Sequence, residues 1–298
     1  MKPVMLGPNQ FRRFFRGGPA IAELRGIDPH DDHSPEDWIG SITTTFGSER
    51  DGATRLDRVT LKEAIEQDPE AFLGPRHVES FGADPALLVK LLDAGERLPV
   101  HFHPDRSFAR RYLRSRYGKT EAWFIVAARA GAEVGLGFDR DVPADRVAAW
   151  VSEQDGGSML AALNRIAVAP GDTLFVPAGT PHTIGEGILI VELQEPTDLS
   201  VLLEWKSFDI DGAEEGHLGL GFETALRALD RSALSSAGLE ALSSTRPGPG
   251  RPGVEVLFPP EADGFFRAER IRAPALDEWA AGFAILVVID GSGTLESS

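Results

Sequence analysis

The sequence contains no cysteine in its 298 residues. This absence excludes disulfide bonds, thiolate metal ligands and a cysteine nucleophile. No apolar run approaches the roughly 20 residues needed to span a bilayer. Residues 1–18 carry basic side chains but lack the apolar segment of a signal peptide. We therefore expect a cytoplasmic protein.

Positive charge is also scarce. The chain has 30 Lys and Arg against 46 Asp and Glu, which gives a net charge of −16 and a pI near 4.9. Such a surface argues against nucleic acid and against an anionic membrane surface, so we expect neither partner. A small anionic ligand remains compatible with it, because a few local cations decide such binding. The composition leaves the oligomeric state open.

The hydrophobic content of 42% and mean hydropathy of −0.14 are those of an ordinary globular protein. Between residues 86 and 210 the strand signals dominate, in short apolar segments bounded by Gly, Pro or Asp. Many short strands at such intervals predict an antiparallel sandwich or barrel. The expected strands are 87–92, 99–103, 122–127, 173–176, 187–193 and 200–205, with a further candidate at 41–46 and helical insertions at 107–116 and 145–163.

Helical and linker signals flank this region. Thr60 and Glu63 have the spacing of a capping box at the start of a helix over residues 61–66, and a second helical turn is expected over 68–74. Later segments predict helix at 223–242, a Pro/Gly linker, and strands at 253–258, 265–271 and 283–289. The predicted organisation is a metal-binding domain over 1–215, a helical insertion over 216–242, a linker over 243–253 and a partial β unit over 254–298.

Two histidines separated by one residue open the candidate site. On a strand, His101 and His103 would share one face, roughly 6.5–7 Å apart along it. Paired histidines on one strand face are a common start to a metal site. The spacing alone is also compatible with two unrelated polar histidines. A second histidine pair, in His30-Asp-Asp-His33, fits a solvated loop better than a metal site.

Two more segments supply the remaining candidate ligands. Lys119, Glu121 and Trp123 share a face by the period of a strand, and a buried carboxylate there needs a partner such as a metal. Residues 171–182 match the second cupin motif, G-x5-P-x-G-x2-H, at every fixed position, and end at His182. Three imidazoles and one carboxylate suit Zn, Fe, Mn, Co or Ni.

The chain resembles the type I mannose-6-phosphate isomerases, which are cupin metalloenzymes. The resemblance implies a mainly β fold, a cupin jelly-roll β-barrel with helical insertions and a second, incomplete cupin-like β unit. It also implies one divalent metal ion, zinc, and a metal-dependent isomerase that interconverts mannose 6-phosphate and fructose 6-phosphate through a cis-enediol. The segments that carry it are 34–41, 88–94, 100–105, 118–123, 176–185 and 191–194.

Carried over by motif, the metal ligands are His101, His103, Glu121 and His182. His101 departs from the family, which has Gln at this position. The candidates for proton transfer are Glu192, which shares a strand face with Gln194, and Lys119, beside Glu121; Glu192 is also compatible with a carboxylate that only hydrogen-bonds a metal ligand. The substrate-binding candidates are Lys90, Arg106 and Lys206.

Lys206 is a candidate because the family's arginine beyond the E-x-Q block has no counterpart in residues 200–207. Arg106 is a further departure, since the family often has Asp there. The other arginines between 110 and 116 fit a solvated helix face. Three alternatives remain: an isomerase of another sugar, a cupin oxygenase, and a non-catalytic metal-cupin module that binds sugar.

Overall fold

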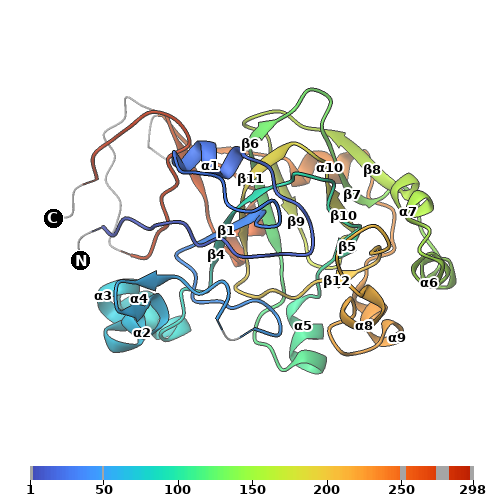
Figure 1. Cartoon of the computed structure of the whole chain (residues 1–298), viewed down its shortest axis with the longest axis horizontal. Coiled ribbons are helices and arrows are strands. Elements are labelled where there is room, and N and C mark those ends of the chain that lie inside the picture. The colour runs from blue at the N-terminus through green and yellow to red at the C-terminus, as the bar shows by residue number, and fades with distance from the viewer. Residues whose placement is uncertain (1–2, 49, 249–252, 273–281, 296–298) are drawn as a thin grey trace.

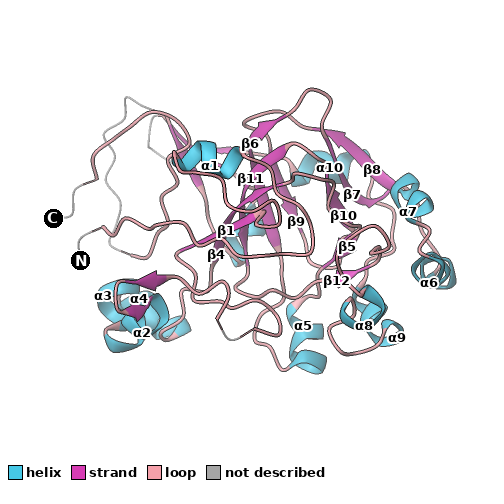
Figure 2. Ribbon diagram, in the orientation of Figure 1, coloured by secondary structure: helices cyan, strands magenta, loops and turns pink. Residues whose placement is uncertain are grey.

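Two five-stranded antiparallel sheets form the centre of the molecule, with the helices at its periphery (Figures 1 and 2). The computed structural model describes residues 3–48, 50–248, 253–272 and 282–295. The first sheet has the order β1 (Glu36–Ile39), β4 (Leu88–Asp93), β11 (Ile188–Gln194), β6 (Glu121–Ala128) and β9 (Thr173–Val176). The second has the order β12 (Val201–Leu202), β5 (His101–Phe102), β10 (His182–Ile184), β7 (Glu133–Phe138) and β8 (Leu163–Ala167).

Smaller elements surround these sheets. The short strands are β2 (Arg55–Leu56) and β3 (Val59–Thr60), which pair together, and β13 (Arg246–Pro247), β14 (Val254–Val256) and β15 (Glu269–Ile271), which form a three-stranded sheet. The helices before β7 are α1 (Ala20–Arg25), α2 (Leu61–Gln67), α3 (Pro69–Leu73), α4 (Pro75–Phe81), α5 (Arg106–Phe108) and the π-helical turn η1 (Ala109–Leu113). The later ones are α6 (Ala144–Glu153), α7 (Gly156–Ala162), α8 (Gly212–Glu215), α9 (Phe222–Ala225), η2 (Leu226–Ala228), α10 (Ser236–Leu242) and η3 (Pro260–Gly264).

The alternation of side chains along each strand decides what lies between the two sheets. On β6, Trp123 and Ile125 point inward and pack with Leu136 and Ile184 of the second sheet. Ala122 and its alternate neighbours belong to another cluster, on the outer face of the first sheet. Because inward and outward residues alternate with a period of two, each strand offers one apolar face to each layer. The functional side chains share the inner face.

The outer face of each sheet is covered by other parts of the chain. Ile21 of α1 and the C-terminal residues Phe258 and Phe266 pack on the first sheet. Helices α6 and α7 contribute Trp150 and Met159 to a cluster beside the second sheet. Helices α2–α4 lie together at one end of the molecule and α6 and α7 at the other (Figure 1). Among the described residues, no helix is long and apolar enough to cross a membrane.

Several predicted elements are confirmed by the structure. The capping box of α2 is present, since the Thr60 side chain accepts from the Glu63 backbone N–H and the Glu63 side chain accepts from the Thr60 N–H. Residues 145–163 fold as α6 and α7, and β9 has the predicted bounds. Strands β5 and β12 are shorter than predicted. Strands β1, β7, β8 and β10 were not predicted at all.

Two predicted strands are wrong. Residues 41–46 form a loop after β1 and pair with no other strand. Within this loop the Ser41 hydroxyl donates to the Thr43 carbonyl. Residues 283–289 are described but belong to no strand, although their exposure alternates along the segment. The predicted domain boundaries stay predictions, and residues 249–252 of the linker lie outside the described residues. Of the C-terminal unit, residues 273–281 and 296–298 also lie outside them.

Candidate metal centre

Three buried histidines meet between the two sheets. His101 and His182 lie opposite each other on β5 and β10, and His103 follows β5 by one residue. The ring centroids are 4.2 Å apart for His101 and His182, 4.8 Å for His103 and His182, and 5.0 Å for His101 and His103. One ring nitrogen of each lies within 4.8 Å of the others. His182, which lies 79 positions after His103 in the sequence, thus presents its nitrogen close to those of His101 and His103.

Backbone carbonyls fix which nitrogen of each imidazole faces that point. Each Nδ1 lies within hydrogen-bond distance of a carbonyl oxygen, which can only accept, so Nδ1 carries the proton. In the neutral ring, Nε2 is then left with its lone pair. The three acceptors are Pro99 for His101 at 2.8 Å, Leu199 for His103 at 2.9 Å and Thr180 for His182 at 2.9 Å.

The histidines are held neutral. Burial lowers the pKa of His103 to about 3, with further lowering by Lys119 that Glu121 only partly offsets. Burial likewise lowers the pKa of His101 and of His182. Neutral imidazoles with a free Nε2 are the form in which histidine binds metals, and a carbonyl on Nδ1 is the usual support for such a ligand.

Glu121 completes the set from the opposite sheet. Its Oε2 lies 3.0 Å from His103 Nε2, and its Oε1 lies 3.4 Å from His182 Nε2. Oε1 accepts from Trp123 Nε1 at 2.9 Å. Burial alone would raise the pKa of Glu121, but Lys119 and the imidazoles lower it well below its usual range, so the carboxyl is ionised.

The residues present fit a divalent cation. Glu121 Oε2 and His182 Nε2 are buried and, among the described residues, have no hydrogen-bond partner. His182 Nε2 and Glu121 Oε1 face each other at 3.4 Å, and an imidazole lone pair and a carboxylate oxygen at this distance repel unless a cation lies between them. Three imidazoles and one carboxylate are a donor set for zinc and its neighbours in the first transition row. The structure therefore brings together all four predicted ligands in a geometry that needs positive charge.

Lys119 supplies part of that charge. Its Nζ lies 2.9 Å from His103 Nε2 and 3.1 Å from Glu121 Oε2. Burial would lower its pKa, but Glu121 and Glu192 raise it above the usual value, so the side chain is an ammonium. Lys119 is thus the positive group that bridges two of the candidate ligands.

Buried charges of alternating sign extend from Lys119 along the inner face of the first sheet. Glu192 lies 3.8 Å from Lys119 Nζ and 3.9 Å from Lys90 Nζ. Lys90 lies 3.7 Å from Glu36 and 4.7 Å from the ring centre of Trp38. The ladders β1–β4 and β4–β11 place Trp38, Lys90 and Glu192 in one register row. Burial raises the pKa of Glu192 to about 8.

The row ends at Arg13, which sequence reasoning did not single out. Arg13 donates to both oxygens of Asp198, at 3.0 and 3.2 Å, and its Nε lies 3.4 Å from Glu36. These three residues stand 23 to 185 positions apart, and no motif spacing relates them. Only the fold brings them together, so the sequence offered no signal for Arg13.

Two predicted substrate-binding residues lie away from this row. Arg106 forms an ion pair with Glu195, and its guanidinium stacks over Phe265 at 4.5 Å from the ring centre. Lys206 is exposed to solvent, and its backbone N–H donates to Gln154. Neither side chain lines the cavity at the metal centre. The predicted Lys90, Lys119 and Glu192 all lie in the row described above.

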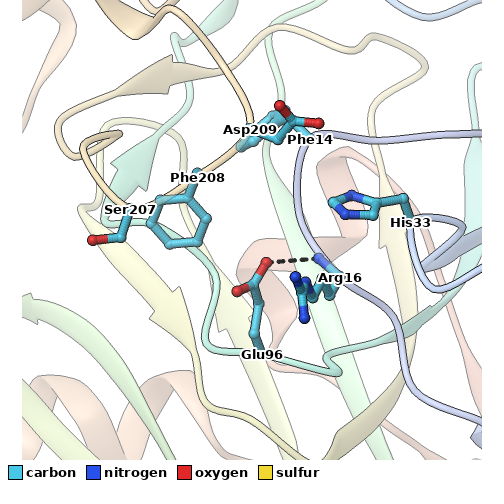
Figure 3. A pocket seen from close by; sticks show the side chains of 7 residues that line it. All are labelled: Phe14, Arg16, His33, Glu96, Ser207, Phe208 and Asp209. Carbon is cyan, nitrogen blue, oxygen red and sulfur yellow. Dashed lines mark hydrogen bonds between the residues drawn. The ribbon is translucent and has the colours of Figure 1, made fainter.

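Two cavities lie near the centre. The inner one, of about 50 Å³, is lined by His101, Lys119, Glu121, Glu192 and Arg13, among others. The outer one, of about 360 Å³, is not lined by any of the three histidines of the centre. Figure 3 shows the rings and charged side chains that line it, among them Phe14, Arg16, His33, Glu96 and Phe208. Phe14 lines both cavities.

The segment around His33 forms a turn beside the outer cavity. His30, Asp31 and Asp32 are exposed, and the His33 carbonyl accepts from the Arg13 N–H at 2.7 Å. The solvated-loop interpretation of this histidine pair therefore agrees with the structure.

Comparisons with known proteins identify relatives of the chain. The chain is 34% identical to mannose-6-phosphate isomerase ManA of Bacillus subtilis over 229 residues, which are 74% of this chain and 67% of the relative. The chain belongs to the mannose-6-phosphate isomerase family. It is also 30% identical over 209 residues to a B. subtilis protein described as "Probable mannose-6-phosphate isomerase GmuF". No protein-family model matches the chain.

A solved structure shows the same fold. The crystal structure of the mannose 6-phosphate isomerase from Bacillus subtilis superposes with a TM-score of 0.66 at 24% identity, over 90% of this chain and 79% of that one. The matched region spans only 62% of the GmuF relative and 67% of ManA.

Proposed function

We propose that this protein is a metal-dependent aldose–ketose isomerase that interconverts mannose 6-phosphate and fructose 6-phosphate. One observation carries the proposal: in a member of this family, His101, His103, Glu121 and His182 converge with Nε2 lone pairs and a carboxylate on one buried point. The metal is proposed to be zinc, for which imidazole and carboxylate are suitable donors.

The proposed fold is a cupin jelly-roll barrel. Its support is the inner apolar cluster, which joins residues of both five-stranded sheets. The three-stranded sheet β13–β15 is proposed to be part of a second, incomplete cupin-like unit. The protein is proposed to act in the cytoplasm on a small sugar phosphate.

The chemistry moves a proton between C1 and C2 through a cis-enediol. A bound divalent metal would act as a Lewis acid toward the two substrate oxygens. Lys119, held as an ammonium within reach of the same ligands, would stabilise negative charge on a substrate oxygen. The burial of Lys119 and Glu121 strengthens these electrostatic interactions.

Glu192 is proposed to carry the proton between the two carbons. Its carboxyl lies on the inner face of β11 and lines the cavity beside the centre. Lys90 and Lys119 flank it at 3.9 and 3.8 Å, so they hold it in place from both sides. In its ionised form, which becomes populated as the pH rises through the pKa of about 8, this carboxyl can accept the proton from one carbon and return it to the other on the same face of the enediol.

The decisive experiment measures turnover and metal content together. Purified protein is assayed for conversion of mannose 6-phosphate to fructose 6-phosphate, before and after removal of metal by EDTA and after zinc is restored. We expect activity that EDTA abolishes and zinc restores. The His182→Ala variant should lose bound zinc and at least about 10²-fold in kcat, since it removes a ligand with a buried, otherwise unpaired nitrogen.

The matched control is Glu186→Gln, an exposed carboxyl on the turn that follows β10. It should keep both metal and activity. Unchanged zinc content in His182→Ala would refute the metal centre. Metal-dependent oxygen uptake without isomerisation would favour an oxygenase, and metal binding with neither activity would favour a sugar-binding module.

A further inference from the structure

The proposed substrate carries a phosphate, yet two of the cations predicted to bind it point elsewhere. Arg106 is paired with Glu195, and Lys206 is exposed at a distance from the inner cavity lining. Among the described residues, the cations that line the inner cavity are Lys119 and Arg13. Lys119 is engaged with the ligands of the metal centre. Arg13 remains as the candidate for a substrate anion among the cations of the inner cavity, whereas Arg16, which lines the outer cavity, is exposed to solvent.

The guanidinium of Arg13 is also the most accessible cation of the buried row. Its side chain keeps 15% exposure, against 1% for Lys90 and 6% for Lys119. A guanidinium has five N–H donors, and Asp198 takes two of them. Nε is buried and, within the described part of the chain, has no hydrogen-bond partner. Nε faces Glu36, so the donors that remain for a ligand are the N–H groups on Nη1 and Nη2 that do not bind Asp198.

The pairing holds the guanidinium in one orientation. Asp198 binds it in the two-pronged geometry that suits arginine, and Glu36 lies 3.4 Å from Nε. The backbone of Arg13 is fixed as well, because its N–H donates to the His33 carbonyl. A cation held this way loses little conformational freedom when it binds an anion.

The size of the inner cavity indicates where the phosphate would lie. A cavity needs roughly 10–15 Å³ for each water, so about 50 Å³ accommodates only a few atoms of a hexose phosphate. The reacting end can enter, while the far end must extend toward the outer cavity. Phe14, which lines both cavities, directly follows Arg13 in the chain. Arg13 thus stands where the far end of the sugar would leave the centre.

We propose that Arg13 binds the phosphate of the substrate and makes the enzyme select a phosphorylated over an unphosphorylated sugar. Asp198 is its positioning residue. The inference rests on the proposed function, and it assigns the anion-binding role to the N-terminal segment rather than to residues 200–207.

The test is a binding measurement on zinc-loaded protein with two ligands, mannose 6-phosphate and mannose. Titration calorimetry of Arg13→Gln should show a dissociation constant for mannose 6-phosphate that is about 10- to 100-fold higher, the effect of losing charge-assisted hydrogen bonds. The constant for mannose should change by no more than about twofold. The dissociation constant of Arg13→Lys for mannose 6-phosphate should lie between those of the wild type and Arg13→Gln. Lysine keeps the positive charge but lacks the parallel N–H donors of the guanidinium.

Arg12→Gln is the matched control. Arg12 precedes Arg13 directly, but its side chain is 61% exposed and pairs with Asp209 at the surface. This variant should bind both sugars like the wild type. Should Arg13→Gln fail to fold with Asp198 unpaired, the double variant Arg13→Gln/Asp198→Asn replaces the ion pair by two amides and is measured instead.

Three results would overturn the proposal. They are an unchanged affinity of Arg13→Gln for mannose 6-phosphate, an equal loss for both sugars, and a wild type that binds mannose 6-phosphate no more tightly than mannose. A separate turnover assay of the wild type distinguishes these from a failure of the proposed function. Isomerisation of both sugars at equal efficiency would keep the isomerase and remove the role of Arg13. Selective binding of mannose 6-phosphate without turnover would keep the role of Arg13 and refute the isomerase activity.

Discussion

Each imidazole of the candidate centre is oriented by a backbone carbonyl rather than by another side chain. The carbonyls of Pro99 and Thr180 belong to the residues two positions before His101 and His182. For these two histidines the local chain conformation therefore selects the tautomer, whereas His103 depends on the carbonyl of Leu199, 96 positions later in the chain. A donor set prepared in this way needs little rearrangement to accept a cation.

The four candidate ligands could be picked out from the sequence because each belongs to a short motif. His182 follows the Pro/Gly turn of the cupin pattern, and Glu121 shares a strand face with Trp123. Short motifs could not predict that Arg13, Glu36 and Asp198 lie together beside the centre. Their role depends on pairing between distant segments, which residue spacing does not encode.

Asp198 gives a prediction about acid stability. Burial alone would raise its pKa, but the adjacent Arg13 more than reverses this and lowers the pKa from 3.8 to about 2. A carboxyl whose pKa is lower in the folded state stabilises the protein above its unfolded pKa, and this contribution is lost as the pH falls through the folded value. The window for Asp198 is therefore about pH 4 to pH 2.

The measurement compares wild type with Asp198→Asn, both free of metal, by urea unfolding at several pH values. The difference in unfolding free energy should shrink by about 2 kcal/mol between pH 5 and pH 2. Asp145→Asn, which changes an exposed carboxyl, serves as the control and should follow the wild type. Parallel curves for wild type and Asp198→Asn would contradict the assigned pairing.

At the scale of elements, the first residue of α2 is determined by a capping box between Thr60 and Glu63. Thr60 and Glu63 satisfy each other's backbone N–H groups in the first turn, so the helix start is fixed without tertiary contacts. Thr60→Ala should lower the unfolding free energy by about 1 kcal/mol, the usual cost of removing an N-cap. Chemical denaturation measures it, with Lys62→Ala on the exposed face of α2 as control. A loss no larger than that of the control would show that the cap contributes nothing.

Strands were less predictable than this helix, because a strand needs a partner. Residues 283–289 are rich in Val, Ile and Leu, yet the described structure gives them no ladder. Conversely, β7 contains Gly135 and Gly137, which weaken a strand signal. Its place is set by pairing with β10 and β8, and an added side chain at Gly135 would meet Leu163 and Thr183. Such glycines mark close approach between elements, which only the folded chain reveals.

At the scale of the whole molecule, the question is whether the C-terminal sheet is independent. Phe258 and Phe266 lie in the same apolar cluster as Val89, Phe124 and Val191 on the outer face of the first sheet. The segment that connects β14 and β15 thus shares a core with the part of the chain that carries the metal centre. Elements that share one core are expected to unfold together.

Phe258→Ala tests this coupling. The ring is 2% exposed, so its removal should cost about 3–5 kcal/mol through lost burial and the cavity left behind. Because the cluster joins both parts, thermal unfolding should stay a single transition at a lower midpoint, followed by calorimetry and by tryptophan fluorescence. Phe46→Ala, at a ring that is 54% exposed, should change the midpoint little. A separate early transition in Phe258→Ala, with the main one unshifted, would show instead that residues 254–298 form a unit with a core of their own.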